Sequence, residues 1–115
     1  MHPCAVLLDE LLFLIPAEEK ALADEDTERA EELAGQRAEL LQKAWTSRDG
    51  YNAEELRHRL LQVQAAQSRL HEAAEALHAK LRAQQRAGRK QTRYFNADRK
   101  IQAQLQRAFY CDKIS

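Results

Sequence analysis

The fold is decided by residues 52–88, NAEELRHRLLQVQAAQSRLHEAAEALHAKLRAQQRAG, which carry one unbroken heptad pattern. Its seam positions alternate between steps of four and three residues, at Leu56, Leu60, Val63, Gln67, Leu70, Ala74, Leu77, Leu81 and Gln84. This alternation keeps one side of a helix turned toward a partner. Because the seam includes two Gln and one Ala, such a helix cannot stay folded alone in water. It needs other helices to pack against.

A matching pattern precedes this stretch, at Leu22, Asp26, Ala30, Leu33, Arg37, Leu40 and Ala44. Two successive steps of four form a stutter near residues 24–26, where the seam locally unwinds. Asp49 and Gly50 give a turn signal between the two patterned stretches, and so short a connection makes antiparallel neighbours. Folding the chain there places residue i opposite residue 100 − i, roughly, so Leu33 should face Gln67 and Leu22 should face Leu77.

We therefore predict an all-α protein that forms a single helical domain over residues 1–115. Its architecture should be a long antiparallel, coiled-coil-like helical hairpin with a short C-terminal helix, since helix-favouring residues dominate and the chain has only three Gly and two Pro. The expected helices span about residues 3–46 with a kink near Pro16, about residues 53–88 ending at Gly88, and about residues 98–110.

The charges argue against a nucleic-acid partner. The formal net charge is zero, and the acids of residues 1–32 should neutralise the bases of residues 80–107, either within the hairpin or across a dimer. Within residues 86–95, however, several cations precede Tyr94 and Phe95, a combination suited to gripping phosphates and stacking bases. A nucleic-acid-binding or regulatory coiled coil that uses residues 82–100 is therefore the alternative function.

Nothing in the sequence indicates an enzyme or a metal site. His71, Glu75 and His78 share one helical face, but ligands spread along a straight helix cannot converge on one ion, so we expect them at the solvated edge of the seam. The spacing suggests no catalytic Ser/His/Asp or Cys/His grouping, and there is no Gly-rich phosphate loop. We expect no catalytic residues, no metal and no cofactor.

The compartment is predicted from the cysteines and the N-terminal segment. Cys4 and Cys111 have no metal-binding spacing, and we expect both to be reduced thiols. The apolar run 5–15 is interrupted by Asp9 and Glu10 and is too short to span a bilayer. We therefore expect a soluble, cytoplasmic protein with no membrane insertion.

Two apolar surfaces remain without an assigned partner. The first turns of the chain, residues 7–15, carry more apolar surface than one small helix can cover, so we predict a homodimer when the protein is free. The C-terminal helix places Ile101, Leu105, Ala108 and Phe109 on one stripe and is marginal alone. It should either dock on residues 7–15 or remain available to another molecule.

One run of residues adds a family resemblance. Glu19, Leu22, Asp26, Leu33, Arg37, Leu40 and Leu41 form the pattern E…L…D…L…R..LL. This pattern resembles the N-terminal half of the small flagellar type III export chaperones of the FlgN and FliT kind. The chain length and the separable C-terminal helix also fit, and the resemblance covers residues 8–80. After Gly88 the chain departs from the family pattern.

The resemblance implies a function. Such a chaperone binds the amphipathic terminal helix of a flagellar hook-associated or filament subunit, keeps the subunit unassembled and presents it to the export apparatus. The client-binding residues it implies are Leu8, Leu11, Leu12, Ile15, Ile101, Leu105 and Phe109. We further expect the C-terminal helix to act as an internal placeholder that a client displaces. A purely structural adaptor remains a third possibility.

Overall fold

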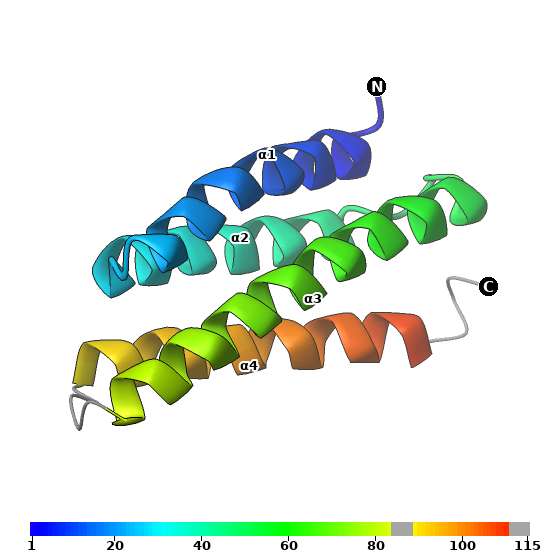
Figure 1. Ribbon diagram of the computed structural model, residues 1–115. Coiled ribbons are helices and arrows are strands. Elements are labelled where there is room, and N and C mark those ends of the chain that lie inside the picture. The colour runs from blue at the N-terminus through cyan, green and yellow to red at the C-terminus, as the bar shows by residue number, and fades with distance from the viewer. Residues whose placement is uncertain (84–88, 111–115) are drawn as a thin grey trace.

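Four helices account for the regular structure that the computed structural model describes, which covers residues 1–83 and 89–110. They are α1 (Pro3–Ala23), α2 (Thr27–Thr46), α3 (Ala53–Ala83) and α4 (Arg89–Tyr110). The all-α prediction is confirmed, and Figure 1 shows that the helices run as antiparallel hairpins. Within the described residues, no helix is long and apolar enough to cross a membrane.

The first predicted helix is two helices. α1 continues through Pro16, which lies on its exposed face, and the chain reverses instead at residues 24–26, where the heptad stutter lies. Glu25 adopts a left-handed conformation with φ of 58°. The N–H of Asp26 donates to the carbonyl of Ala21 at 2.8 Å, and this bond closes the end of α1 in a Schellman arrangement. Asp26 then caps α2 by accepting from the N–H of Arg29 at 3.1 Å.

The C-terminal helix is longer than the pattern indicated. α4 begins at Arg89 rather than near residue 98, because its early turns bury Tyr94 and Phe95, which are 0% and 9% exposed. Tertiary packing thus extends a helix that local signals alone would start later. Gly88, the expected end of the second helix, lies outside the described residues.

The two hairpins pack face to face. α1 pairs with α2 and α3 pairs with α4, while α1 lies beside α3 and α2 lies beside α4 (Figure 1). Along the α1/α3 contact, Arg69 lies 3.7 Å from Glu19 and Lys80 lies 2.6 Å from Glu25, so these neighbours run parallel. The connection of residues 47–52 therefore crosses the bundle, and α2 and α3 run antiparallel on opposite corners. The molecule measures 49 × 24 × 19 Å.

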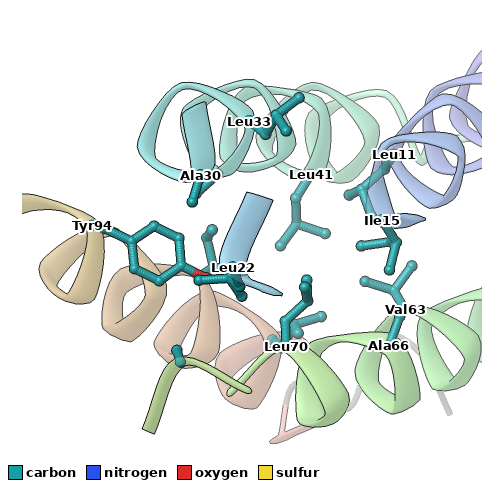
Figure 2. Packing of buried hydrophobic residues seen from close by; sticks show 14 of the residues in the cluster. Leu11, Ile15, Leu22, Ala30, Leu33, Leu41, Val63, Ala66, Leu70 and Tyr94 are labelled. Atoms are coloured by element: carbon teal, nitrogen blue, oxygen red, sulfur yellow. The ribbon is translucent and has the colours of Figure 1, made fainter. Parts of the chain in front are cut away.

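The core lies between the four helices. Figure 2 shows Ile15, Leu41, Val63 and Leu70 directed toward one another from α1, α2 and α3. Leu22 and Leu77, predicted to face each other, both belong to this core. Burying a large aliphatic side chain contributes about 1.5–3 kcal/mol, so this core is the main source of stability.

The start of α1 is fixed against the crossing connection. His2 Nδ1 accepts from the N–H of Cys4 at 3.1 Å, which caps the helix, and His2 Nε2 lies 3.0 Å from the carbonyl oxygen of Asp49. Its ring also stacks on Tyr51 with 4.8 Å between centroids. Gly50 has a φ of 81°, a conformation that glycine adopts without strain. These contacts tie the first residues of the chain to the α2–α3 connection.

Candidate functional site

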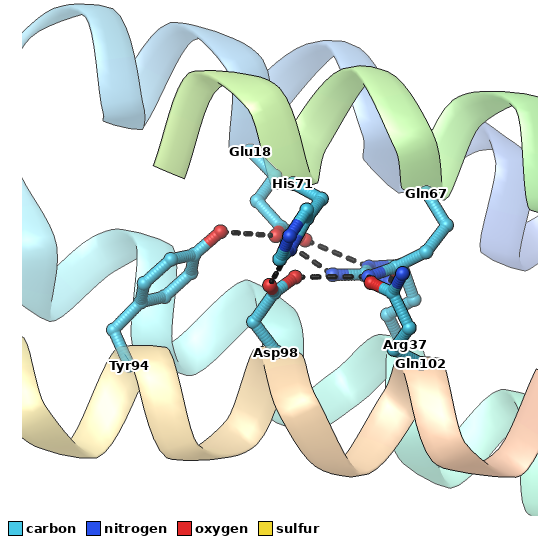
Figure 3. Close-up of polar contacts among 7 residues, drawn as sticks. All are labelled: Glu18, Arg37, Gln67, His71, Tyr94, Asp98 and Gln102. Carbon is cyan, nitrogen blue, oxygen red and sulfur yellow. Dashed lines mark hydrogen bonds and ion pairs between the residues drawn. The ribbon is translucent and has the colours of Figure 1, made fainter. Parts of the chain in front are cut away.

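A cluster of polar side chains fills the middle of the bundle where one would expect apolar packing. The polar cluster, as we call it, is made of Glu18 from α1, Arg37 from α2, Gln67 and His71 from α3, and Tyr94, Asp98 and Gln102 from α4 (Figure 3). Glu18, Arg37, Gln67, Tyr94 and Asp98 are each no more than 2% exposed. Every helix contributes at least one of these buried groups.

A buried ion pair joins the first hairpin. Arg37 Nε donates to Glu18 Oε1 and Arg37 Nη2 donates to Glu18 Oε2, both at 2.9 Å. The two side chains are 1% and 0% exposed. Each charge would be costly to bury alone, and the two-point geometry is what makes the pair tolerable. The pair therefore fixes how α1 sits on α2.

α4 completes the ion pair from the other side. The hydroxyl of Tyr94 donates to Glu18 Oε2 at 3.1 Å. Burial of the phenol, reinforced by the neighbouring Glu18 carboxylate, raises the pKa of Tyr94 well above its usual value. The hydroxyl therefore keeps its proton and stays a donor. Glu18 thus has a partner on α2 and a second partner on α4.

The amide of Gln67 links the ion pair to Asp98. Arg37 Nη1 donates to Gln67 Oε1, and Gln67 Nε2 donates to Asp98 Oδ1 at 2.9 Å. A longer contact of 3.4 Å joins the same nitrogen to Gln102 Oε1. The other oxygen of Asp98 lies 2.9 Å from His71 Nδ1. Since a carboxylate only accepts, this contact assigns the proton to Nδ1 of His71.

The polar cluster fixes how the four helices meet. Its donors and acceptors are paired with one another, and no groove described below is lined by its residues. In the part of the chain that the structure describes, no three His, Cys, Asp or Glu side chains gather to hold a metal ion. His71 is 37% exposed and contacts Asp98, and His78 packs against Phe95 with ring centroids 4.5 Å apart.

The residues implied as client-binding lie in or against the core. Leu8, Leu11, Ile15, Ile101 and Leu105 are at most 3% exposed, and Leu12 and Phe109 are partly buried. α1 and α4 occupy opposite corners of the bundle, so the C-terminal helix does not lie directly along residues 7–15 as one prediction had it. A partner can reach these side chains only if a helix moves away.

Two shallow grooves flank α2 on the surface. One lies between α2 and α4 and is lined by Leu41, Gln42, Trp45, Gln104, Arg107 and Ala108. The other lies between α1 and α2 and is lined by Glu10, Phe13, Leu14, Gln36, Glu39, Leu40 and Lys43. Phe13 is 84% exposed beside the second groove. Together with Leu14 and Leu40, which line the same groove, the ring of Phe13 forms a candidate contact surface.

The sequence places two members of the polar cluster on heptad seams but does not predict that a buried polar cluster forms there. These two residues are Arg37 and Gln67, which contact each other, whereas the residue predicted to face Gln67 was Leu33. His71 was expected at a solvated edge and instead bonds to buried Asp98. Glu18, Tyr94 and Asp98 carried no signal of burial, because their partners come from distant parts of the chain.

The proposed basic surface is described only in part. Arg82, Arg99 and Lys100 are exposed, while the side chains of residues 84–93 and the whole of Cys111 lie outside the described part of the chain. Cys4 is a buried free thiol whose pKa is raised by burial.

Comparisons with protein-family models, with curated proteins and with solved structures find no match to this chain. Its function has to be inferred from the geometry around α4.

Proposed function

We propose that the protein is a chaperone that binds an amphipathic helix of a partner protein in the place that α4 occupies. The observation that carries this proposal is the face that α4 turns inward. Tyr94, Asp98, Ile101, Leu105 and Ala108 are all buried and follow each other at steps of four, three, four and three residues. This heptad spacing is what any helix needs to lie along the same path.

The contacts of α4 favour exchange. It packs along α2 and more sparsely along α3, whereas α1 and α2 pack closely along their length. α4 follows α3 through residues 84–88, so it can leave the bundle while the chain stays intact. A helix that docks with a modest free energy can be displaced by a competitor that binds the same surface. In this proposal α4 is an internal placeholder.

The resemblance of residues 8–80 to flagellar type III export chaperones suggests the partner. The client would be the amphipathic terminal helix of a hook-associated or filament subunit, held unassembled in the cytoplasm and passed to the export apparatus. Leu8, Leu11 and Ile15 lie in the core that such a client would share. With Ile101, Leu105 and Phe109 withdrawn, part of that core becomes available to a client.

Calorimetric titration of subunit terminal peptides into the full-length chain tests the proposal. Leu105→Ala should loosen α4 by about 2–5 kcal/mol and should tighten peptide binding by at least about tenfold. Leu56→Ala on α3, where Leu56 is 4% exposed, is the matched control, since it removes similar core volume from a helix that stays in the bundle. It should leave the peptide affinity unchanged.

Two outcomes would contradict the proposal. If Leu105→Ala abolishes binding while the chain stays helical, α4 is itself the client-binding element and the placeholder idea is wrong. If no subunit peptide binds either variant, and oligonucleotides bind with an affinity that falls steeply with salt, the nucleic-acid alternative replaces the chaperone.

A further inference from the structure

We infer that the polar cluster selects the partner helix by its chemistry. It accepts a helix that carries a hydroxyl donor and, four residues later, a carboxylate, with large apolar residues three and seven residues after the acid. On α4 these positions are Tyr94, Asp98, Ile101 and Leu105. The inference rests on the proposed function, because it assumes that a partner helix takes the place of α4.

The requirement for an acid comes from two donors on α3. Gln67 Nε2 and His71 Nδ1 each lie 2.9 Å from a different oxygen of Asp98. Gln67 cannot turn away, because its own oxygen accepts from buried Arg37. A side chain with two acceptor oxygens satisfies both donors, whereas an aliphatic side chain leaves His71 Nδ1 without this acceptor and Gln67 Nε2 with only the longer contact to Gln102 Oε1.

The requirement for a hydroxyl comes from Glu18. Its carboxylate is 0% exposed and already takes two bonds from Arg37, and Tyr94 adds a third at 3.1 Å. A second carboxylate at the Tyr94 position would place like charges together in the core. A phenylalanine would pack there but would leave that face of Glu18 without a donor.

Charge decides against a basic residue at the position of Asp98. Arg37 and Glu18 pair with each other, so the groups that hold the Asp98 carboxylate are the donors of Gln67 and His71. A lysine there would face the donors of Gln67 and His71 at a position where Asp98 is 2% exposed. The site therefore favours an acidic partner helix over a basic one.

The spacing also fixes the direction of the partner. The hydroxyl must precede the acid by one helical turn and the apolar pair must follow, so a helix inserted in reverse would put an apolar side chain against Glu18. The partner must run antiparallel to α3, as α4 does (Figure 1). A wrong partner helix is rejected because it deprives the buried polar groups of Glu18 and Gln67 of a hydrogen-bond partner.

The test uses full-length Asp98→Ala, in which α4 is loosened while Glu18, Arg37, Gln67 and His71 remain. The probe is a labelled peptide of residues 89–110. The matched peptide carries Asn96→Asp together with Asp98→Asn, which moves the acid to an exposed position and leaves composition and net charge unchanged. We expect the native peptide to bind at least about tenfold more tightly, since the moved acid leaves buried donors poorly paired.

Full-length Leu105→Ala is the second host, loosened without touching the polar cluster, and it should rank the two peptides in the same order. If both peptides bind equally well to both hosts, the cluster does not read the acid and this inference is overturned while the proposed function stands. If neither peptide binds to either host, the site of α4 cannot be occupied from outside, and the proposed function fails with the inference.

Discussion

Arg37 is the residue on which the interior of the bundle depends. Its guanidinium bonds to Glu18 and to Gln67, and through Gln67 it reaches Asp98 on α4. A buried ion pair often stabilises a fold no more than apolar residues of similar volume would. Its value here is that it fixes which faces of α1, α2 and α3 meet, and it leaves Glu18 ready to accept from Tyr94.

Removing one charge of this pair should be far more damaging than removing an exposed one. Arg37→Met should lower the free energy of unfolding by about 3–5 kcal/mol, because Glu18 then stays buried without its cation. Glu19→Gln, which breaks the solvent-exposed pair with Arg69, should cost less than about 1 kcal/mol. Urea denaturation monitored by helicity gives both values. Similar costs for the two variants would show that the buried pair is not essential.

Glu25 offers a second prediction at the scale of one residue. Its φ of 58° is unfavourable for any residue with a Cβ, and its side chain pairs with Lys80 at 2.6 Å on the surface. Glu25→Ala removes only the ion pair, whereas Glu25→Gly also relieves the backbone. We expect the Gly variant to be more stable than the Ala variant by about 1 kcal/mol in thermal unfolding. Equal stabilities would contradict the left-handed turn.

At the scale of the helices, α2 contains a residue that weakens it without visible compensation. Gly35 is exposed, and a Cβ built there meets nothing within 4 Å. Gly35→Ala should therefore stabilise the protein by about 0.5–1 kcal/mol through helix propensity. Chemical denaturation measures this gain. A loss of stability would contradict this prediction, because it would show that a Cβ at residue 35 meets a neighbour.

The sequence predicted the helices well where one seam runs without interruption. α3 was predicted because its heptad is continuous from Leu56 to Leu81. The division between α1 and α2 was not predicted, because the same hydrophobic period continues on both sides of residues 24–26. The turn also lacks the usual glycine, since its left-handed residue is Glu25. A stutter alone does not distinguish a kinked helix from a tight reversal.

The start of α4 and the polar cluster required tertiary information. Tyr94 and Phe95 extend α4 only because the other helices offer a core to receive them. Glu18 and Asp98 have the appearance of surface acids in the sequence, and only the partner helices reveal them as buried acceptors. Arg37 and Gln67, polar on a seam, were the usable signal.

In the whole bundle, the hydrophobic seam of one helix does not determine which other helix becomes its neighbour. A short connection at residues 47–52 suggested that the helices before and after it lie side by side, yet the chain crosses the bundle there. The result is two hairpins that share one interior. The polar residues at the centre of that interior can bond to one another in one register of the helices, as buried polar groups set the register in other helical assemblies.

The exposed ring of Phe13 bears on self-association. We expect the free protein to form a homodimer at tens of micromolar through the groove between α1 and α2, where Leu14 and Leu40 lie beside this ring. Phe13→Ser should shift the protein toward monomer in sedimentation velocity, because each buried Phe contributes about 1.5–3 kcal/mol. Leu61→Ser, at a residue that is 46% exposed on α3, is the control. A monomeric native protein would refute the expected dimer.

The proposed exchange requires that α4 can leave the bundle while α1, α2 and α3 remain folded. Native-state hydrogen exchange of the full-length chain tests it most directly, because it resolves the free energy of opening helix by helix. We predict that the amides of Ile101 and Leu105 exchange through an opening that costs at least about 1–2 kcal/mol less than global unfolding, while those of Leu33 and Leu70 exchange only with global unfolding. If all four helices share one opening free energy, α4 is an integral part of the core and not a placeholder.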